Sequence, residues 1–127
     1  MLVRIDAKDP RPIYVQIMDE VRRARVLGLV GAEEPLPSVR QLATELRVNP
    51  NTVQQAYREL EREGVVYVRR GQGTYLSAGS VNGVERGTLA RGVAERALLE
   101  ARRNGIGAEE LIAAIRSLTE ALEGRET

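Results

Sequence analysis

The residues of this sequence best suited to recognising another molecule lie at the start of one predicted helix. Asn49 supplies a capping side chain, Pro50 suits the first helical position, and Gly64 lies just past the end. At 3.6 residues per turn, an apolar face of this helix turns inward and a polar face turns outward. The inward stripe consists of Val53, Ala56, Tyr57 and Leu60. The outward set consists of Asn51, Gln54, Gln55 and Arg58, with Thr52 in the same first turn.

The outward set carries the chemistry that reads base pairs in duplex DNA. Asn and Gln side chains pair bidentately with adenine in the major groove, and Arg pairs with guanine. The start of a helix also presents free backbone N–H groups and a positive dipole end to a phosphate. In most proteins, however, an exposed Gln-Gln pair is ordinary solvated surface. The flanking elements therefore have to decide between the two interpretations.

Those flanking elements follow a recognisable order. A first helix is predicted after Pro12, and a second opens at Ser38 and Gln41, whose S-x-x-Q spacing predicts a capping box. Two β-rich runs, Val65–Val68 and Thr74–Ser77, flank the segment RRGQG and predict a hairpin with a basic tip. Helix, helix, short turn, helix and hairpin is the order of a winged helix-turn-helix. The expected fold class is mostly α with a small β-hairpin. The inward positions of the first two helices are Ile13, Ile17, Met18, Val21, Ala24, Val39, Leu42, Ala43 and Leu46.

The rest of the chain predicts a helical tail. Residues 78–87 have the composition of a linker, so residues 1–77 are expected to form the winged domain and residues 88–127 the tail. Helices are predicted at Thr88–Asn104 and Ala108–Leu122. Their apolar stripes pack either on the winged domain or on a second copy of the tail. The second copy is favoured because two short helices after a linker cannot bury both faces alone. The residues predicted for dimerisation are Leu89, Val93, Ala97, Leu111, Ile112, Ile115, Leu118 and Leu122.

Composition argues against several other classes of protein. The chain has 127 residues and contains neither cysteine nor histidine, which removes the thiolate zinc site, the commonest general base and the commonest metal ligand. We therefore expect no cofactor, no metal and no enzymatic activity. No apolar run approaches the roughly 18–20 residues of a membrane span, so a cytoplasmic protein is expected. The formal net charge is only +1, so any binding of nucleic acid must rest on the local placement of charge.

The glycines of RRGQGT do not make a nucleotide-binding loop. The spacing G-x-x-x-x-G-K-[ST] is absent, and the segment joins two predicted strands, whereas a P-loop runs from a strand into a helix. Gly71 and Gly73 are better explained as turn residues with positive φ. The arginines Arg69 and Arg70 at this tip are either DNA contacts or a solubilising surface.

The stretch Leu36–Ser77 resembles the DNA-binding domain of the GntR family of bacterial transcription regulators. PIYVQI at Pro12–Ile17 resembles the start of that domain's first helix, and the short tail is similar to the YtrA-like subfamily, in which it is thought to serve dimerisation. The resemblance implies DNA contacts from the second helix, from the start of the recognition helix and from the wing tip. On this chain those positions are Ser38, Arg40, Asn49, Pro50, Asn51, Thr52, Gln54, Arg69, Arg70, Gly71 and Gln72.

Two departures from the family pattern bear on these expectations. Pro50 stands where many relatives have an arginine, so their base preference does not transfer to this chain. Ala32, Glu33 and Glu34 replace the usual Pro-Gly-Asp turn ahead of Leu-Pro-Ser.

The sequence therefore predicts a homodimeric, sequence-specific regulator that binds double-stranded DNA at an inverted repeat. A repressor is favoured over an activator because a bound dimer can simply occlude a promoter. The alternative is a protein-interaction module that kept the winged fold and lost DNA binding, an interpretation motivated by Pro50 and the near-neutral charge. No dedicated effector domain is visible, so a small-molecule effector is left unassigned.

Overall fold

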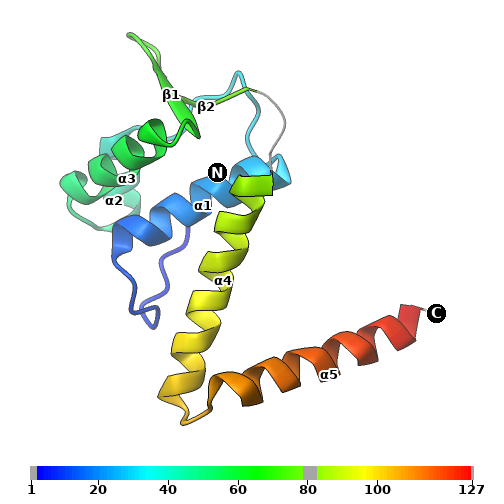
Figure 1. Cartoon of the computed structure of the whole chain (residues 1–127). Coiled ribbons are helices and arrows are strands. Elements are labelled where there is room, and N and C mark those ends of the chain that lie inside the picture. Colours follow the sequence, from blue (N-terminus) through cyan, green and yellow to red (C-terminus); the bar gives the residue numbers. More distant parts are fainter. Residues whose placement is uncertain (1–2, 79–82, 127) are drawn as a thin grey trace. The chain divides into compact units, whose positions relative to one another are not determined.

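Three helices and a hairpin enclose one apolar core. The computed structural model describes residues 3–78 and 83–126. Its first three helices are α1 (Ile13–Leu27), α2 (Val39–Leu46) and α3 (Pro50–Arg62). Figure 1 shows the hairpin of β1 (Val66–Arg69) and β2 (Gly73–Leu76) extending away from these helices. This order confirms the predicted winged helix-turn-helix with a mostly α content.

The predicted inward stripes account for most of this core. The largest side chains that are fully buried are Ile17, Leu42, Leu60, Val21, Val53 and Val66. Burying an aliphatic side chain of this size contributes about 1.5–3 kcal/mol relative to exposure. Ile13 differs from the prediction because it is 38% exposed at the first position of α1. Val39 and Leu46 are only partly buried against the same cluster.

The helix ends are fixed as the local sequence predicts. The Ser38 hydroxyl accepts a hydrogen bond from the Gln41 backbone N–H at 3.1 Å, and the Gln41 side chain accepts from the Ser38 N–H at 2.9 Å. The Asn49 side chain accepts from the Asn51 N–H at 2.8 Å, with Pro50 next to it at the helix start. Between these helices Arg47 adopts φ of +57°, the left-handed conformation that closes α2.

The hairpin has a shorter tip than the sequence predicts. The two strands pair antiparallel, with Val66 opposite Leu76 and Arg69 opposite Gly73. The Gln72 N–H donates to the Arg69 carbonyl at 2.9 Å, which leaves a three-residue tip in place of the five-residue one. Each strand is therefore displaced by one residue from the prediction, although the Ser77 N–H still bonds the Val65 carbonyl at 2.9 Å. The shift arises because turn closure, not β propensity, decides where pairing stops.

The segment ahead of α2 also pairs with the hairpin. Pro35 forms an isolated antiparallel bridge with Tyr75, and the Leu36 N–H donates to the Thr74 carbonyl at 2.8 Å. The loop that replaces the usual Pro-Gly-Asp turn thus lies against β2 on the edge opposite β1.

Half of the predicted linker is helical. Helix α4 spans Gly83–Arg103, so residues 83–87 are helical, while residues 79–82 lie outside the described part of the chain. Two glycines predicted a break because each costs about 0.5–1 kcal/mol in a helix relative to alanine. Glu85 offsets part of that cost, since an acidic residue in the first turn is favoured by the helix dipole and this one pairs with Arg25.

The chain divides into two compact units, Met1–Arg91 and Gly92–Thr127. In the second unit, α4 ends at a turn in which Gly105 adopts φ of +72° and the Ile106 N–H bonds the Ala101 carbonyl at 2.8 Å. Helix α5 (Ala108–Glu126) follows and runs four residues beyond the predicted Leu122. None of the helices in the described residues is long and apolar enough to cross a membrane.

Candidate nucleic-acid interface

Helix α3 separates its apolar and polar residues onto opposite faces. All four predicted inward residues are buried, and Asn51, Gln54, Gln55 and Arg58 are exposed. Asn49 and Pro50 are also exposed, and Thr52 is half-buried. Within residues 3–78 and 83–126, the Asn51, Gln54, Gln55 and Arg58 side chains make no hydrogen bond or ion pair. The face therefore presents amide and guanidinium groups that are available to a partner.

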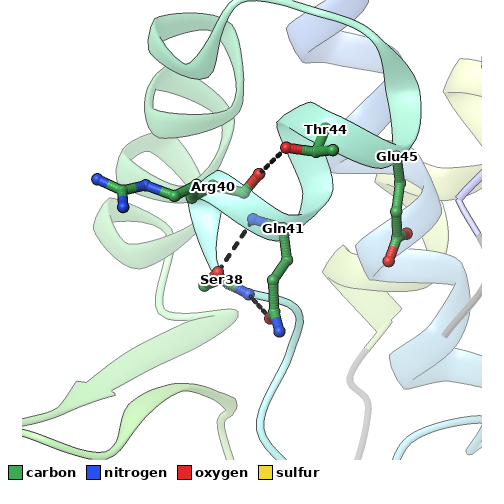
Figure 2. Close-up of a pocket in the computed structure, with 5 residues that line it drawn as sticks. All are labelled: Ser38, Arg40, Gln41, Thr44 and Glu45. Carbon is green, nitrogen blue, oxygen red and sulfur yellow. Dashed lines mark hydrogen bonds between the residues drawn. The ribbon is translucent and has the colours of Figure 1, made fainter.

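The start of α2 lies beside an open hollow of about 520 Å³, lined by Ser38, Arg40, Gln41, Thr44 and Glu45. Ser38 and Gln41 bond to each other there, and Figure 2 shows the Arg40 guanidinium pointing away from the other four residues. The Ser38 hydroxyl is occupied in capping the helix, whereas Arg40 is exposed and carries the positive charge. Arg40 is therefore the residue here best placed to reach a phosphate.

Tyr57 fixes α3 to the loop that precedes α2. Its hydroxyl donates a hydrogen bond to the Pro37 carbonyl at 2.6 Å, and the residue is 5% exposed. Burial, with a smaller contribution from the negative charge of Glu45, raises the pKa of the Tyr57 phenol, which therefore stays protonated as a donor. The prediction that Tyr57 faces the core is confirmed, but the bond to Pro37 had no sequence signal.

The two adjacent arginines of the wing have different surroundings. Arg70, Gly71 and Gln72 form the exposed tip. Arg69 instead folds back along the hairpin, where its Nε donates to the Tyr67 hydroxyl at 2.9 Å and its Nη1 pairs with a Glu33 carboxylate oxygen at 3.2 Å. Hydrogen bonding to Glu33, followed by that to Tyr67, raises the pKa of the Arg69 guanidinium.

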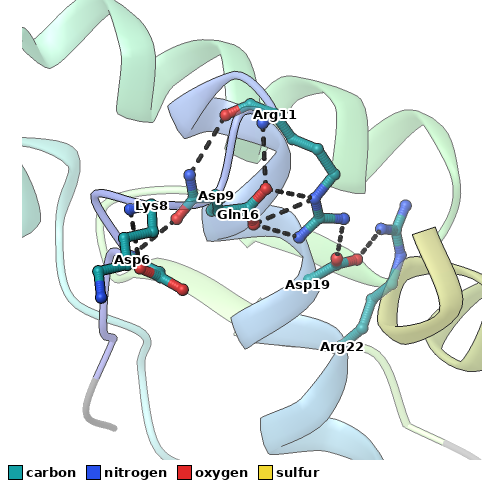
Figure 3. Close-up of polar contacts among 7 residues, drawn as sticks. All are labelled: Asp6, Lys8, Asp9, Arg11, Gln16, Asp19 and Arg22. Atoms are coloured by element: carbon teal, nitrogen blue, oxygen red, sulfur yellow. Dashed lines mark hydrogen bonds and ion pairs between the residues drawn. The ribbon is translucent and has the colours of Figure 1, made fainter. Parts of the chain in front are cut away.

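A buried ionic network holds the N-terminal segment on α1 and reaches the end of α3. Arg11 pairs with Asp9 at 2.9 Å and with Asp19 at 2.7 Å, and all three side chains are almost fully buried (Figure 3). Arg22 joins Asp19 at 3.1 Å to Glu63, the C-cap residue that follows α3, at 2.6 Å. Burial lowers the pKa of Arg11, but the bonds to Asp9 and Asp19 outweigh this and raise it overall. The network fixes α3 relative to α1.

Sequence reasoning missed this network for a physical reason. Asp19 and Arg22 are three residues apart on one helix, a spacing that signals a pair. Arg11 and Asp19 are not related by any helical period because Arg11 precedes α1, and Glu63 lies 41 residues beyond Arg22.

Helix α5 carries an exposed apolar stripe. Ile112, Ile115, Leu118 and Leu122 are 40%, 49%, 65% and 58% exposed, and they recur at spacings of three and four residues. Val93 of α4 is 52% exposed, whereas Leu89, Ala97 and Leu111 are partly buried.

Comparisons with known proteins agree with this architecture. The family described as "Bacterial regulatory proteins, gntR family" matches residues 13–76. The HTH-type transcriptional repressor YtrA of Bacillus subtilis is 34% identical over 125 residues, which are 97% of this chain and 96% of that protein. The solved structure of YtrA from Sulfolobus acidocaldarius, a GntR-family transcription factor, has a TM-score of 0.59 and 31% identity, covering 74% of this chain and 99% of that one. The AraR DNA-binding domain in complex with operator ORE1 has a TM-score of 0.51 and 21% identity, covering 61% and 94%.

The fold and the matched relatives define a winged-helix regulator of transcription and not an enzyme. This chain belongs to the GntR family of bacterial regulatory proteins, and it is YtrA-like in matching YtrA over nearly its whole length.

Proposed function

We propose that this regulator binds duplex DNA sequence-specifically, with the exposed face of α3 in the major groove and the wing tip at the adjacent minor groove. The observation that carries the proposal is the polar face of α3, whose amide and guanidinium groups are exposed and unoccupied by the described chain. Asn51, Gln54, Gln55 and Arg58 read base edges, and Asn49, Pro50 and Thr52 place the helix start against a phosphate. Ser38, Arg40, Arg70, Gly71 and Gln72 surround this face as further contacts.

The proposed assembly is a homodimer formed through the tail. A stripe of four large aliphatic side chains on α5, each between 40% and 65% exposed, is unfavourable in water and favours burial against a second copy. A two-fold dimer would present two α3 helices to successive turns of the major groove, so the operator would be an inverted repeat.

The proposed regulator is a repressor that acts in the cytoplasm, and its relatives support the repressor role. YtrA of Bacillus subtilis is a transcriptional repressor, and the AraR DNA-binding domain forms a complex with its operator. A dimer bound across a promoter would hinder access by the transcription machinery, so repression needs no further activity of the protein.

The test is a selection of random duplex DNA on the purified protein at two salt concentrations. The expected product is an inverted repeat whose affinity falls with salt, because phosphate contacts release condensed counterions. Recovery of single half-sites would contradict the dimer. Recovery of no sequence above background would contradict DNA binding and support the interaction-module alternative.

A further inference from the structure

The two adjacent arginines of the wing, one at the end of β1 and one in the tip, do not have equal freedom. Within the described residues, Arg70 is exposed and makes no hydrogen bond or ion pair. Arg69 is held from several directions at once. Its guanidinium carbon lies 3.9 Å from the centroid of the Tyr75 ring and 5.5 Å from that of Tyr67, in addition to its bonds to the Tyr67 hydroxyl and Glu33.

The hairpin register explains why these groups meet. Tyr67 and Tyr75 are opposite each other on paired strands, and Arg69 follows Tyr67 by two residues, so all three side chains share one face of the hairpin. That face lies toward the loop ahead of α2, because Pro35 forms its bridge with Tyr75 and the Ala32 carbonyl accepts from Arg69 at 3.5 Å. Arg69 thus spans the hairpin and this loop.

The stacking contributes more to this arrangement than the ion pair. The Glu33 side chain is 85% exposed, and ion pairs in such surroundings are screened and contribute little. Tyr75 is 6% exposed, so its ring is a fixed surface, and a planar guanidinium stacks on it in a way that an ammonium group cannot reproduce.

We infer that Arg69 is a positioning residue that fixes the wing against the loop ahead of α2, and that Arg70 is the arginine of this pair that contacts DNA phosphate. The inference rests on the proposed DNA interface and gives the two arginines different roles in it. Arg69 acts through the orientation of the hairpin, so it affects binding mainly by placing Arg70.

The first test compares Arg69→Lys with Arg70→Lys, which both preserve charge. Lysine is a good phosphate ligand, so Arg70→Lys is expected to bind the selected operator almost as the parent does. Arg69→Lys loses the planar guanidinium that stacks on Tyr75 and its several N–H donors. This variant is expected to weaken operator binding about fivefold. Operator binding by Arg69→Lys that equals that of the parent would overturn the inference. Thermal unfolding of both variants verifies that they fold.

A double-mutant cycle then separates positioning from direct contact. If Arg69 acts through Arg70, Arg69→Lys loses most of its effect in an Arg70→Gln background. Two independent phosphate contacts would instead make the effects of Arg69→Gln and Arg70→Gln additive. Each would make the negative slope of log affinity against log salt concentration shallower by about 0.9. Additive losses would overturn the inference.

The two interpretations of Arg69 predict different effects on DNA affinity when the charge of Glu33 is removed. If Arg69 is a phosphate contact restrained by Glu33, Glu33→Gln releases it and strengthens DNA binding beyond the gain from deleting one negative charge. If Arg69 is a positioning residue, Glu33→Gln matches its control Glu34→Gln or binds more weakly. The control lies in the same loop and changes the same charge, and its glutamine retains the oxygen that accepts from the Gly31 N–H at 3.1 Å.

A measurement without DNA keeps this inference separable from the proposed function. In the free protein, the Arg69 Nε–H resonance is expected to exchange slowly with solvent and to carry a ring-current shift from Tyr75. Tyr67→Phe, which removes only the hydroxyl acceptor, is expected to speed that exchange. Failure of the parent protein to bind any duplex would refute DNA binding, whereas a freely exchanging Arg69 resonance would refute the positioning role.

Discussion

Two helices of this protein carry apolar stripes of similar spacing, but one stripe is buried and the other is exposed. On α3, Val53 and Leu60 are 0% exposed because α1, α2 and the hairpin close over them. On α5, Leu118 and Leu122 are 65% and 58% exposed. The first unit thus buries the apolar stripe of α3, whereas the second unit leaves the stripe of α5 exposed. Periodicity alone predicts a helix and its apolar side, but only the surrounding chain decides whether that side is already buried.

The largest effect is expected from Leu60→Ala in the winged unit. Truncation of a fully buried leucine leaves a cavity and lowers the free energy of unfolding by about 2–5 kcal/mol. Urea denaturation monitored by circular dichroism measures the change in the free energy of unfolding. The matched control is Leu122→Ala, the same truncation at an exposed site, measured at protein concentrations low enough to dissociate a dimer. Equal losses in the two variants would mean that the two stripes do not differ in burial within one chain.

The next effect tests what covers the α5 stripe. Ile115→Glu places a charge amid the exposed apolar side chains and is expected to prevent self-association, because an unpaired carboxylate is costly to bury. Binding to the inverted repeat should then fall about 100-fold toward that of a half-site, since the two halves no longer bind as one unit. Sedimentation and operator titration provide the measurements.

Ser117→Glu is the control for this change, because Ser117 is exposed on the same helix and lies away from the stripe. It should leave both the oligomeric state and operator affinity unchanged. A dimer that survives Ile115→Glu would exclude this stripe as the contact.

A smaller effect distinguishes base recognition by α3 from electrostatic attraction of the wing to the DNA backbone. Gln54→Ala is expected to relax base preference at one operator position by about 1–3 kcal/mol, because one bidentate pair is lost. Arg70→Ala should instead weaken binding across sequences and flatten the salt dependence. Titration of a set of single-base operator variants compares the two, and a uniform loss with Gln54→Ala would contradict its assignment to a base.

The smallest effect is expected at the start of α2. Ser38→Ala removes the hydroxyl that accepts the Gln41 N–H and should lower the free energy of unfolding by about 1 kcal/mol. Ser38→Asp retains an acceptor and should unfold close to the parent. Thermal denaturation measures both, and an unchanged midpoint for Ser38→Ala would show that the cap contributes nothing to stability.

Local chemistry made most of the winged domain predictable from sequence. The Ser38 and Asn49 caps, Pro50 at the start of α3 and the stripe from Val53 to Leu60 depend on neighbours within one or two turns. Such signals can be recognised in the sequence without knowledge of the fold. The exposure of Asn51 and Gln54 follows from the same periodicity, so the candidate recognition face was predicted residue by residue.

Pairings across the chain could not be predicted in the same way. Arg69 meets Glu33 36 residues away, and Arg22 meets Glu63 41 residues away. Neither distance corresponds to a period of any local element, so these contacts exist only once the chain has folded. The start of α4 at Gly83 could not be predicted from composition, because residues 78–87 have the composition of a linker.

The separation of faces on α3 has a consequence for how such regulators diversify. Substitutions at exposed helix positions usually change stability by less than about 0.5 kcal/mol. Gln54, Gln55 and Arg58 can therefore vary while the buried face of the same helix keeps the domain folded. After gene duplication, one copy could drift to a new binding sequence through a series of fully folded intermediates, and its sister copy would keep the ancestral target.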